Sequence, residues 1–549
     1  MQRDLAATRD QIFDLLIVGG GITGACIARD ASMRGLTVAL VEQHDFSHAT
    51  SAATSKLVHG GLRYLKNGEL GLIRASLRER HIWQRIAPHL VRPVSFIVPM
   101  YSASGWGRWR MSAALSIYDL LAFDKGWFRD PTSRLPSHKM ISRDDALALE
   151  PLIEEEGLQG ALVYHECQMH SPERLGLECI IDAVRHGAIV ANHASVTGFL
   201  RERGAVAGAV VRDEITGTLH ELRARVVVNA TGPWVDNLLG LLSNADRSPR
   251  IRRSKGVHLV VKQLTRGNAI VKQTPNGSHL MVIPWRGHSL VGTTDTLFNG
   301  LPDAVGVTEG DVEQLLVEVN VNFPRARLTR ADVVHFYAGV RPLVDSDAER
   351  RNTYGASRRM EIVDHAKVNS VEGLISTMGG KWTTARETAA RVVSLAAAKL
   401  GRRIPRSRTH RNQLPGGALD RFPTFAAFVA DAQANNPQLS SDTIYDLARS
   451  HGSRLPQVIA LMNERSGHES IIAGRPNYMA EVLLAVRHEM AMTLDDVIFR
   501  RLGLGSLGNP GMLAIERIAH VMGVELHWTA PERSRQIEDV LTRFHTQEA

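Results

Sequence analysis

Three glycines and one carboxylate near the N-terminus have the spacing of a dinucleotide-binding site. Gly19, Gly21 and Gly24 form the pattern G-x-G-x-x-G, and Glu42 follows about 20 residues later. In this pattern the glycines permit a tight turn, a close approach of the backbone to a pyrophosphate, and packing of a helix on a strand. The helix N-terminus offers free N–H groups to the pyrophosphate, and the acid accepts hydrogen bonds from a ribose. The chemistry implied is the binding of NAD or FAD.

The stretch TSKLVHGGLRYL, residues 54–65, also carries unusual chemistry. It holds a lysine, a histidine, two glycines, an arginine and a tyrosine, and apolar residues stand between them. This mixture predicts a basic, glycine-bearing turn pressed against the core rather than a surface loop.

Secondary-structure signals around the glycines support the interpretation that these residues form a dinucleotide-binding site. Residues 13–18 and 36–41 are apolar runs typical of buried parallel strands. Residues 22–34 have helical spacing, and Gly35 follows them as a helix C-cap. The strand, the glycines, the helix, the second strand and the acid occur in this order. The whole pattern is therefore much stronger evidence for a dinucleotide-binding site than the glycines alone.

Two later segments favour FAD over NAD. Residues 225–236 (RVVVNATGPWVD) read as a buried strand that runs into Ala-Thr-Gly, and residues 374–400 read as a strand, a Gly-Gly turn and a long helix. Both resemble elements of flavin oxidoreductases of the glutathione-reductase-like class. The expected fold is therefore α/β, with an FAD-binding Rossmann-like domain, an antiparallel β cap domain and a C-terminal helical domain.

Composition narrows the class of protein. The chain has 549 residues, 44% of them hydrophobic, which predicts a globular protein of several domains. A net charge of +8 favours an acidic partner, but aromatic residues make up 5% and no nucleic-acid recognition motif is visible, so nucleic acid ranks last. The cysteines Cys26, Cys167 and Cys179 show no metal or disulfide spacing, so no metal site is expected.

Taken together, these motifs resemble the FAD-dependent glycerol-3-phosphate dehydrogenase family of the aerobic, quinone-linked type. The stretches that carry the resemblance are IVGGGITGACIARDA, ATSAATSKLVHGGLRYL, VVNATGPWVD, SKGVHLVV, IPWRGHSLVGTTD, YAGVRPLVD, STMGGKWTTARE and, near the C-terminus, AVRHEMAMTLDDVIFRR. SKLVHGGLRYL and GVRPLVD are the most specific of them. The resemblance covers nearly the whole chain.

The resemblance implies FAD as cofactor, lying along residues 50–61. The expected cofactor contacts are Gly19, Gly21, Gly24, Glu42, Thr50, Ser51, Ser55, Lys56, Gly60, Gly61, Thr231, Gly232, Gly379, Gly380 and Thr383. For Lys56 the alternative is that it only flanks the cofactor-binding segment. His59 is interpreted as a structural histidine.

The resemblance also implies that sn-glycerol 3-phosphate is oxidised to dihydroxyacetone phosphate, with hydride transfer from C2 to flavin N5 and electron transfer to membrane quinone. A phosphate calls for arginine forks and lysine charges. The expected substrate contacts are Arg63, Tyr64, Arg358 (exchangeable with Arg359) and Lys381. His258 and Arg341 are the catalytic candidates, with their division of roles left open and a core position as the alternative for His258.

One stretch departs from the family pattern. Residues 170–174 read His-Ser-Pro-Glu-Arg, where the family usually has adjacent aspartates before Ala-Arg-Leu. If this stretch lined the mouth of the pocket, the substrate would differ from glycerol 3-phosphate.

The expected domain organisation is discontinuous. Segments 10–90, 160–250 and 335–400 are assigned to the FAD-binding domain, and 91–159 with 251–334 to the cap. A basic linker, 401–417, precedes the helical domain, 418–549. In that domain Thr529 and Glu532 predict a capping box.

Residues 105–123, which combine tryptophans and arginines with an apolar helical stretch, suit a membrane interface or a helix packed in the cap. No signal peptide or spanning segment is recognised. The expected location is therefore the cytoplasm, peripherally on the inner face of the cell membrane. Expected partners are the phosphorylated substrate, quinone and the membrane surface, and a homodimer stays open.

Two alternative functions remain. One is an FAD-dependent oxidase that passes electrons to oxygen, acting on glycerol 3-phosphate or a related small substrate. The other is a flavin-binding protein without catalysis. An amine substrate is disfavoured because Arg63, Arg341 and Lys381 predict a cationic pocket.

Overall fold

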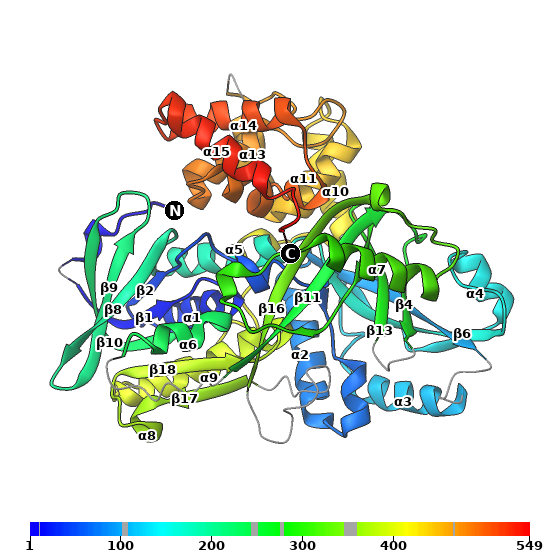
Figure 1. Cartoon of the computed structure of the whole chain (residues 1–549), viewed down its shortest axis with the longest axis horizontal. Coiled ribbons are helices and arrows are strands. Elements are labelled where there is room, and N and C mark those ends of the chain that lie inside the picture. The colour runs from blue at the N-terminus through cyan, green and yellow to red at the C-terminus, as the bar shows by residue number, and fades with distance from the viewer. Residues whose placement is uncertain are drawn as a thin grey trace.

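A computed structural model of the protein describes residues 1–9, 11–101, 108–242, 251–274, 279–344, 360–464 and 467–548. Within these ranges the side chains of residues 63, 66, 67 and 108–110 are not described. Two β-sheets lie side by side, and a group of C-terminal helices, orange and red in Figure 1, covers one edge of them.

The first sheet has a parallel core, in the order β18-β10-β1-β2-β7. Antiparallel strands extend it, with β17 beside β18 and the β8–β9 pair beside β10. Its strands are β1 (Ile12–Val18), β2 (Val38–Val41), β7 (Ile189–Ala191), β8 (Ala194–Glu202), β9 (Ala205–Asp213), β10 (Leu219–Asn229), β17 (Met360–Asp364) and β18 (Leu374–Gly379).

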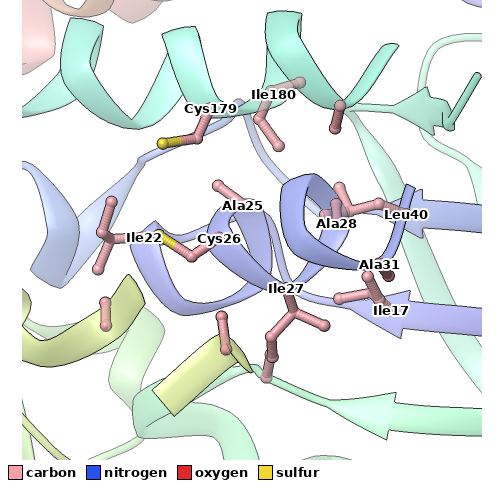
Figure 2. Packing of buried hydrophobic residues seen from close by; sticks show 14 of the residues in the cluster. Ile17, Ile22, Ala25, Cys26, Ile27, Ala28, Ala31, Leu40, Cys179 and Ile180 are labelled. Atoms are coloured by element: carbon pink, nitrogen blue, oxygen red, sulfur yellow. The ribbon is translucent and has the colours of Figure 1, made fainter. Parts of the chain in front are cut away.

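Three helices cover one face of this sheet: α1 (Ile22–Met33), α5 (Pro172–Arg185) and α9 (Ala385–Lys399). Figure 2 shows Cys26 on α1 and Cys179 on α5 within the core that also holds Ile17 of β1. Successive residues of β1 face opposite sides of the sheet, so Ile17 packs under α1 while Val18 belongs to the cluster on the other face. The strand–helix–strand unit predicted for residues 13–41 is confirmed, with Gly35 at φ +80° after the helix.

The second sheet is mainly antiparallel and has the order β15-β11-β14-β13-β12-β4-β6-β3, with β16 beside β11 and β5 beside β6. Its strands are β3 (Leu57–Val58), β4 (Val91–Tyr101), β5 (Lys139–Ile141), β6 (Leu158–Met169), β11 (Ile251–Lys262), β12 (Ala269–Gln273), β13 (His279–Trp285), β14 (His288–Gly292), β15 (Thr296–Leu297) and β16 (Val333–Val344).

The structure places the starts of two expected FAD-binding segments in the other sheet. Segments 160–250 and 335–400 were assigned to the FAD-binding domain, but β6 and β16 lie in the second sheet. The reason is pairing: β16 follows β11 along almost its whole length, and β6 does the same with β4. The chain therefore returns to the first sheet after Met169 and with β17 rather than at residues 160 and 335.

The remaining helices surround the two sheets. In the first part of the chain they are α2 (Leu70–Ile86), α3 (Arg108–Leu121), α4 (Arg143–Leu149), α6 (Val235–Leu239), α7 (Glu309–Asn322) and α8 (His365–Val368). The C-terminal helices are α10 (Phe425–Asn435), α11 (Ser441–His451), α12 (Leu455–Met462), α13 (Met479–Glu489), α14 (Met512–Glu525) and α15 (Ala530–Thr542). The capping box predicted at Thr529 and Glu532 begins α15. The helical domain and the FAD-binding α/β fold expected from the sequence are both present.

Candidate active site

A cavity of about 720 Å³ extends from the glycine turn after β1 to the second sheet. Its volume lies within the range of about 300–1,000 Å³ that is typical of small-molecule sites. Most of the residues predicted from the sequence line it: Gly19, Gly21, Glu42, Thr50, Ser51, Ser55, Gly61, Tyr64, Thr231, Gly232, His258, Arg341, Gly379, Gly380, Lys381 and Thr383. One cavity thus joins the dinucleotide motif to the cationic residues.

The glycine turn has the geometry that its sequence predicts. Gly19 has φ +106°, and a Cβ there would lie 2.7 Å from the carbonyl oxygen of Ala230. A Cβ on Gly24 would lie 1.8 Å from the carbonyl oxygen of Gly19. Gly24 is outside the cavity lining and serves the packing of α1 on the turn, so its contribution to a cofactor site is indirect.

Polar groups at the turn match a dinucleotide. The N–H of Ile22, at the start of α1, points to Ser51 Oγ at 2.9 Å. Glu42, at the end of β2, accepts hydrogen bonds from the N–H groups of Gly20 (2.6 Å) and His44 (2.9 Å). Burial raises the pKa of Glu42. A helix N-terminus donates N–H groups to a pyrophosphate, and a carboxylate that ends the second strand accepts from the hydroxyls of a ribose, so the residues present fit FAD.

Lys56 does not contact the cavity, contrary to the prediction that it lies along the flavin. Its side chain is 2% exposed, and Nζ donates to Glu173 Oε1 at 2.9 Å and to the carbonyl of Ala52 at 2.8 Å. A buried ammonium needs a paired carboxylate, and Glu173 on α5 provides one. Lys56 therefore anchors the 50–61 segment to α5.

Gly60 is also absent from the cavity lining, in contrast to the expectation that it approaches the flavin ring. A Cβ on Gly60 would lie 2.2 Å from Tyr118 Oη, so this glycine makes room for α3. Gly61 does line the cavity and has φ +80°. Only the second glycine of the pair thus borders the expected cofactor site.

Three predicted residues, Lys381, Tyr64 and Arg341, line the cavity and bring two cations to it. Lys381 Nζ donates to Ser76 Oγ at 2.9 Å and lies 4.0 Å from the centre of the Tyr64 ring. Arg341 is half-buried, and its Nη2 donates to Thr293 Oγ1 at 2.8 Å. Asp295 Oδ2 lies 3.6 Å from Arg341 Nη1. These contacts hold both cations at the edge of the cavity.

His258 is a neutral imidazole in the cavity wall. Its Nε2 lies 2.8 Å from Ser55 Oγ, and its ring stacks on Tyr337 with centroids 5.1 Å apart. Burial, together with the positive charges of Arg341 and Lys56, lowers the pKa of His258 to about 3. An uncharged ring nitrogen can accept a proton, whereas a charged one cannot.

Two predicted substrate contacts cannot be placed. Arg358 and its alternative Arg359 lie outside the described residues, and the side chain of Arg63 is not described although its backbone lies in a 3-10 turn, Leu62–Asn67. His170 does not line the cavity in the described part of the chain. The departure from the family pattern at residues 170–174 is therefore separate from the pocket.

The cavity includes polar residues that sequence reasoning did not assign. His59, interpreted as structural, lines it, and its N–H donates to Thr383 Oγ1 at 3.3 Å. His279, Thr293 and Asp295 also line it. Thr293 and Asp295 stand in the family-like stretch IPWRGHSLVGTTD, which was the available signal. Within the described ranges no group of three or more His, Cys, Asp or Glu side chains could hold a metal ion.

Comparisons with known proteins agree with this geometry. The family model for FAD-dependent oxidoreductases matches residues 14–386, and that for the C-terminal domain of alpha-glycerophosphate oxidase matches residues 407–533. A glycerol-3-phosphate dehydrogenase from Synechocystis sp. is 34% identical, with 98% of this chain and 97% of that protein covered. One from Mycobacterium leprae is 34% identical, with 96% and 87% covered.

A solved structure has the same architecture. The crystal structure of the glycerol-3-phosphate dehydrogenase from Bacillus halodurans, complexed with FAD, aligns with a TM-score of 0.78 and 29% identity, covering 98% of this chain and 96% of that one. FAD is thus the cofactor that both the cavity and the family model indicate. The chain belongs to the FAD-dependent glycerol-3-phosphate dehydrogenase family.

Proposed function

We propose that this protein oxidises sn-glycerol 3-phosphate to dihydroxyacetone phosphate and passes the electrons to a membrane quinone. The observation that carries the proposal is the position of Arg341 and Lys381, which line the same cavity as the dinucleotide-binding turn. The names of full-length relatives at 33–34% identity support the same substrate.

The phosphate of the substrate is assigned to the part of the cavity that Arg341 and Lys381 line. Arg341 presents a planar guanidinium, which binds phosphate oxygens in a bidentate manner, and Lys381 adds a point charge. Tyr64, whose ring lies beneath Lys381 Nζ, contributes a hydroxyl group to the same wall.

The reaction removes a hydride from C2 and a proton from the C2 hydroxyl. Bound FAD supplies the hydride acceptor. The proton is assigned to His258, whose neutral ring faces Ser55 in the cavity wall. Because burial and neighbouring cations make His258 a weak base, Arg341 is assigned the stabilisation of the developing negative charge on oxygen.

The proposal is tested by an anaerobic titration of the FAD-loaded protein with sn-glycerol 3-phosphate. We expect the flavin absorbance near about 450 nm to bleach, a property that belongs to the cofactor. A flavin band that stays oxidised would retain the fold and exclude this substrate. Mixing the reduced protein with a soluble quinone analogue, or with oxygen, then separates a dehydrogenase from an oxidase that forms peroxide.

The pH dependence of flavin reduction tests the role of His258. Because its folded-state pKa, about 3, lies below the ordinary value of 6.5, the ring stays uncharged as the pH falls from about 8 to 5. We therefore expect that protonation of His258 does not lower the rate of flavin reduction around pH 6.5. Stopped-flow reduction rates of the wild type and of His258→Asn check this, since the phosphate of the substrate titrates equally in both. An acid limb present only in the wild type would contradict it.

Attachment to the membrane is assigned to the surface at the end of α3. The side chains of Ile117, Leu120, Phe123 and Trp127 are large, apolar and 46%, 74%, 58% and 70% exposed. A patch of this kind suits the boundary between lipid head groups and acyl chains. Figure 1 shows α3 at the edge opposite the C-terminal helices. No described helix is long and apolar enough to cross a bilayer. We propose that the protein lies on the inner face of the cell membrane through this patch.

The double variant Leu120→Asp/Trp127→Asp tests the patch. Burial of one large apolar side chain stabilises binding by about 1.5–3 kcal/mol, so we expect at least about tenfold weaker binding to anionic phospholipid vesicles in co-sedimentation. Leu513→Asp on α14 is the matched control, because Leu513 is 70% exposed on the opposite domain. Equal losses in both variants would indicate that α3 is not the attachment surface. Flavin reduction by the substrate should be unchanged in both.

A further inference from the structure

Arg449 on α11 is a buried cation that has no paired carboxylate among the described residues. The residue is 8% exposed, and its Nη1 is buried with no hydrogen-bond partner in the described part of the chain. Its guanidinium lies 5.9 Å from the centre of the Phe425 ring, and no carboxylate among the described residues lies within ion-pair distance of it. A buried, unpaired charge is unfavourable, so a side chain of this kind favours the binding of an anion.

Two further side chains of the group are those of Arg92 on β4 and of His170, which directly follows β6. Arg92 on β4 lies 4.9 Å from the same Phe425 ring. Arg92 pairs with Gln168 on β6, and the N–H of His170 donates to the carbonyl of Leu90 at 2.7 Å. Paired residues, and every second residue along a strand, share one face of a sheet. Arg92 and His170 therefore project from the same face, beneath the C-terminal helices.

Arg286 completes the group from the turn between β13 and β14. The indole of Trp285 donates to the carbonyl of His170 at 3.0 Å, which places Arg286 next to the altered stretch. Arg286 Nη1 donates to the carbonyl of Gly503 at 3.2 Å, so this side chain also faces the C-terminal domain.

The electrostatics agree with one shared location. Burial lowers the pKa of Arg449 to about 10, and Arg92 is the charge that contributes most to the shift. Burial also lowers the pKa of His170, with further contributions from Arg449 and Arg286. Asp446 is the acid that acts on both Arg449 and Arg286, and burial raises its own pKa.

We propose that Arg92, His170, Arg286 and Arg449 form a second anion site, between the second sheet and the C-terminal helices, that binds a phosphate group. Arginine forks match phosphate oxygens, and an anion there would neutralise a charge that the protein leaves unpaired. Arg92, His170 and Arg286 are half-buried, so a ligand can reach the group from solvent. None of the four lines the active-site cavity, so the site is separate from the proposed function.

The site is tested by thermal unfolding of the FAD-loaded protein in phosphate and in chloride at equal ionic strength. The comparison uses a Lys381→Met background, which weakens phosphate binding at the substrate site. We expect phosphate to raise Tm in a saturable manner. Arg449→Met, added to this background, should raise Tm in chloride because the unpaired charge is gone, and should weaken the phosphate effect at least about tenfold.

Two outcomes with the Arg449→Met variant would overturn the proposal. One is an equal phosphate effect with and without Arg449→Met. The other is a lower Tm of Arg449→Met in chloride, which would mean that Arg449 only supports packing. If that variant does not fold, Arg286→Met provides the same comparison at the rim of the site. Glycerol 2-phosphate, a monoester, is the second probe. Tighter binding of the monoester identifies an organic phosphate as the ligand class, whereas binding of inorganic phosphate alone identifies the free ion, and no saturable effect of either probe excludes the site.

Discussion

Replacing Arg341 with methionine should lower kcat/KM for sn-glycerol 3-phosphate by about 10³-fold or more while FAD stays bound. Methionine keeps much of the side-chain volume and removes both the positive charge and the fork that is assigned to phosphate and to developing charge on oxygen. Arg341 is held from three sides, by Ser254 Oγ at 3.2 Å, by Thr293 Oγ1 at 2.8 Å and by the carbonyl of Thr294. Its orientation is therefore set before the substrate arrives.

Stopped-flow reduction of the flavin under anaerobic conditions measures this loss, and the absorbance of the purified variant reports whether FAD is retained. Arg341→Lys should recover only part of the rate, because an ammonium cannot form the bidentate contact. Arg223→Met, at a guanidinium 48% exposed on β10, is the matched control and should react like the wild type. If Arg341→Met kept the wild-type kcat/KM, the substrate would have to bind elsewhere in the cavity.

Replacing Glu489 with glutamine should destabilise the protein by about 3–5 kcal/mol, because buried arginines would lose their counter-charge. Glu489, the last residue of α13, is 0% exposed. It accepts two hydrogen bonds from Arg174 of α5, both of 3.0 Å, and one of 2.7 Å from Arg454. Arg174 belongs to the flavin-binding sheet layer, so this carboxylate joins the two domains.

The pH dependence follows from the same contacts. Burial alone would raise the pKa of Glu489, but the charges of Arg174 and Arg454 hold it well below its usual range. A depressed carboxyl pKa contributes stability above the unfolded value, about 4.3, and that stability is lost as the pH falls below it. The glutamine variant should lack this contribution at neutral pH already.

Calorimetry of the FAD-loaded protein at neutral pH tests Glu489→Gln, with the onset of the first unfolding transition as the readout. Glu538→Gln on α15 removes an exposed carboxylate and should leave the onset in place. A first transition at the wild-type temperature in Glu489→Gln would show that the domains are held together by other contacts. Recovery of stability in Glu489→Asp, with the charge restored, would attribute the effect to the ion pairs.

The sequence by itself determined the features whose parts lie close together along the chain. The turn at Gly19 and Gly24, α1 and Glu42 depend on backbone geometry within one strand–helix–strand unit, so their spacing was sufficient. The capping box at Thr529 is local in the same sense. The family resemblance predicted that Arg341 and Lys381 share one site, because a resemblance carries tertiary information about relatives, and both residues line the same cavity.

Only the tertiary structure decided the features that depend on distant partners. Lys56 was expected at the flavin, but Glu173, 117 residues away, holds it in the core. Gly60 leaves room for the Tyr118 side chain, and the altered stretch at His170 does not line the substrate cavity. The physical reason is common to all three: a buried charge or a close contact is settled by whichever side chain packing brings against it, and spacing along the chain does not encode that neighbour.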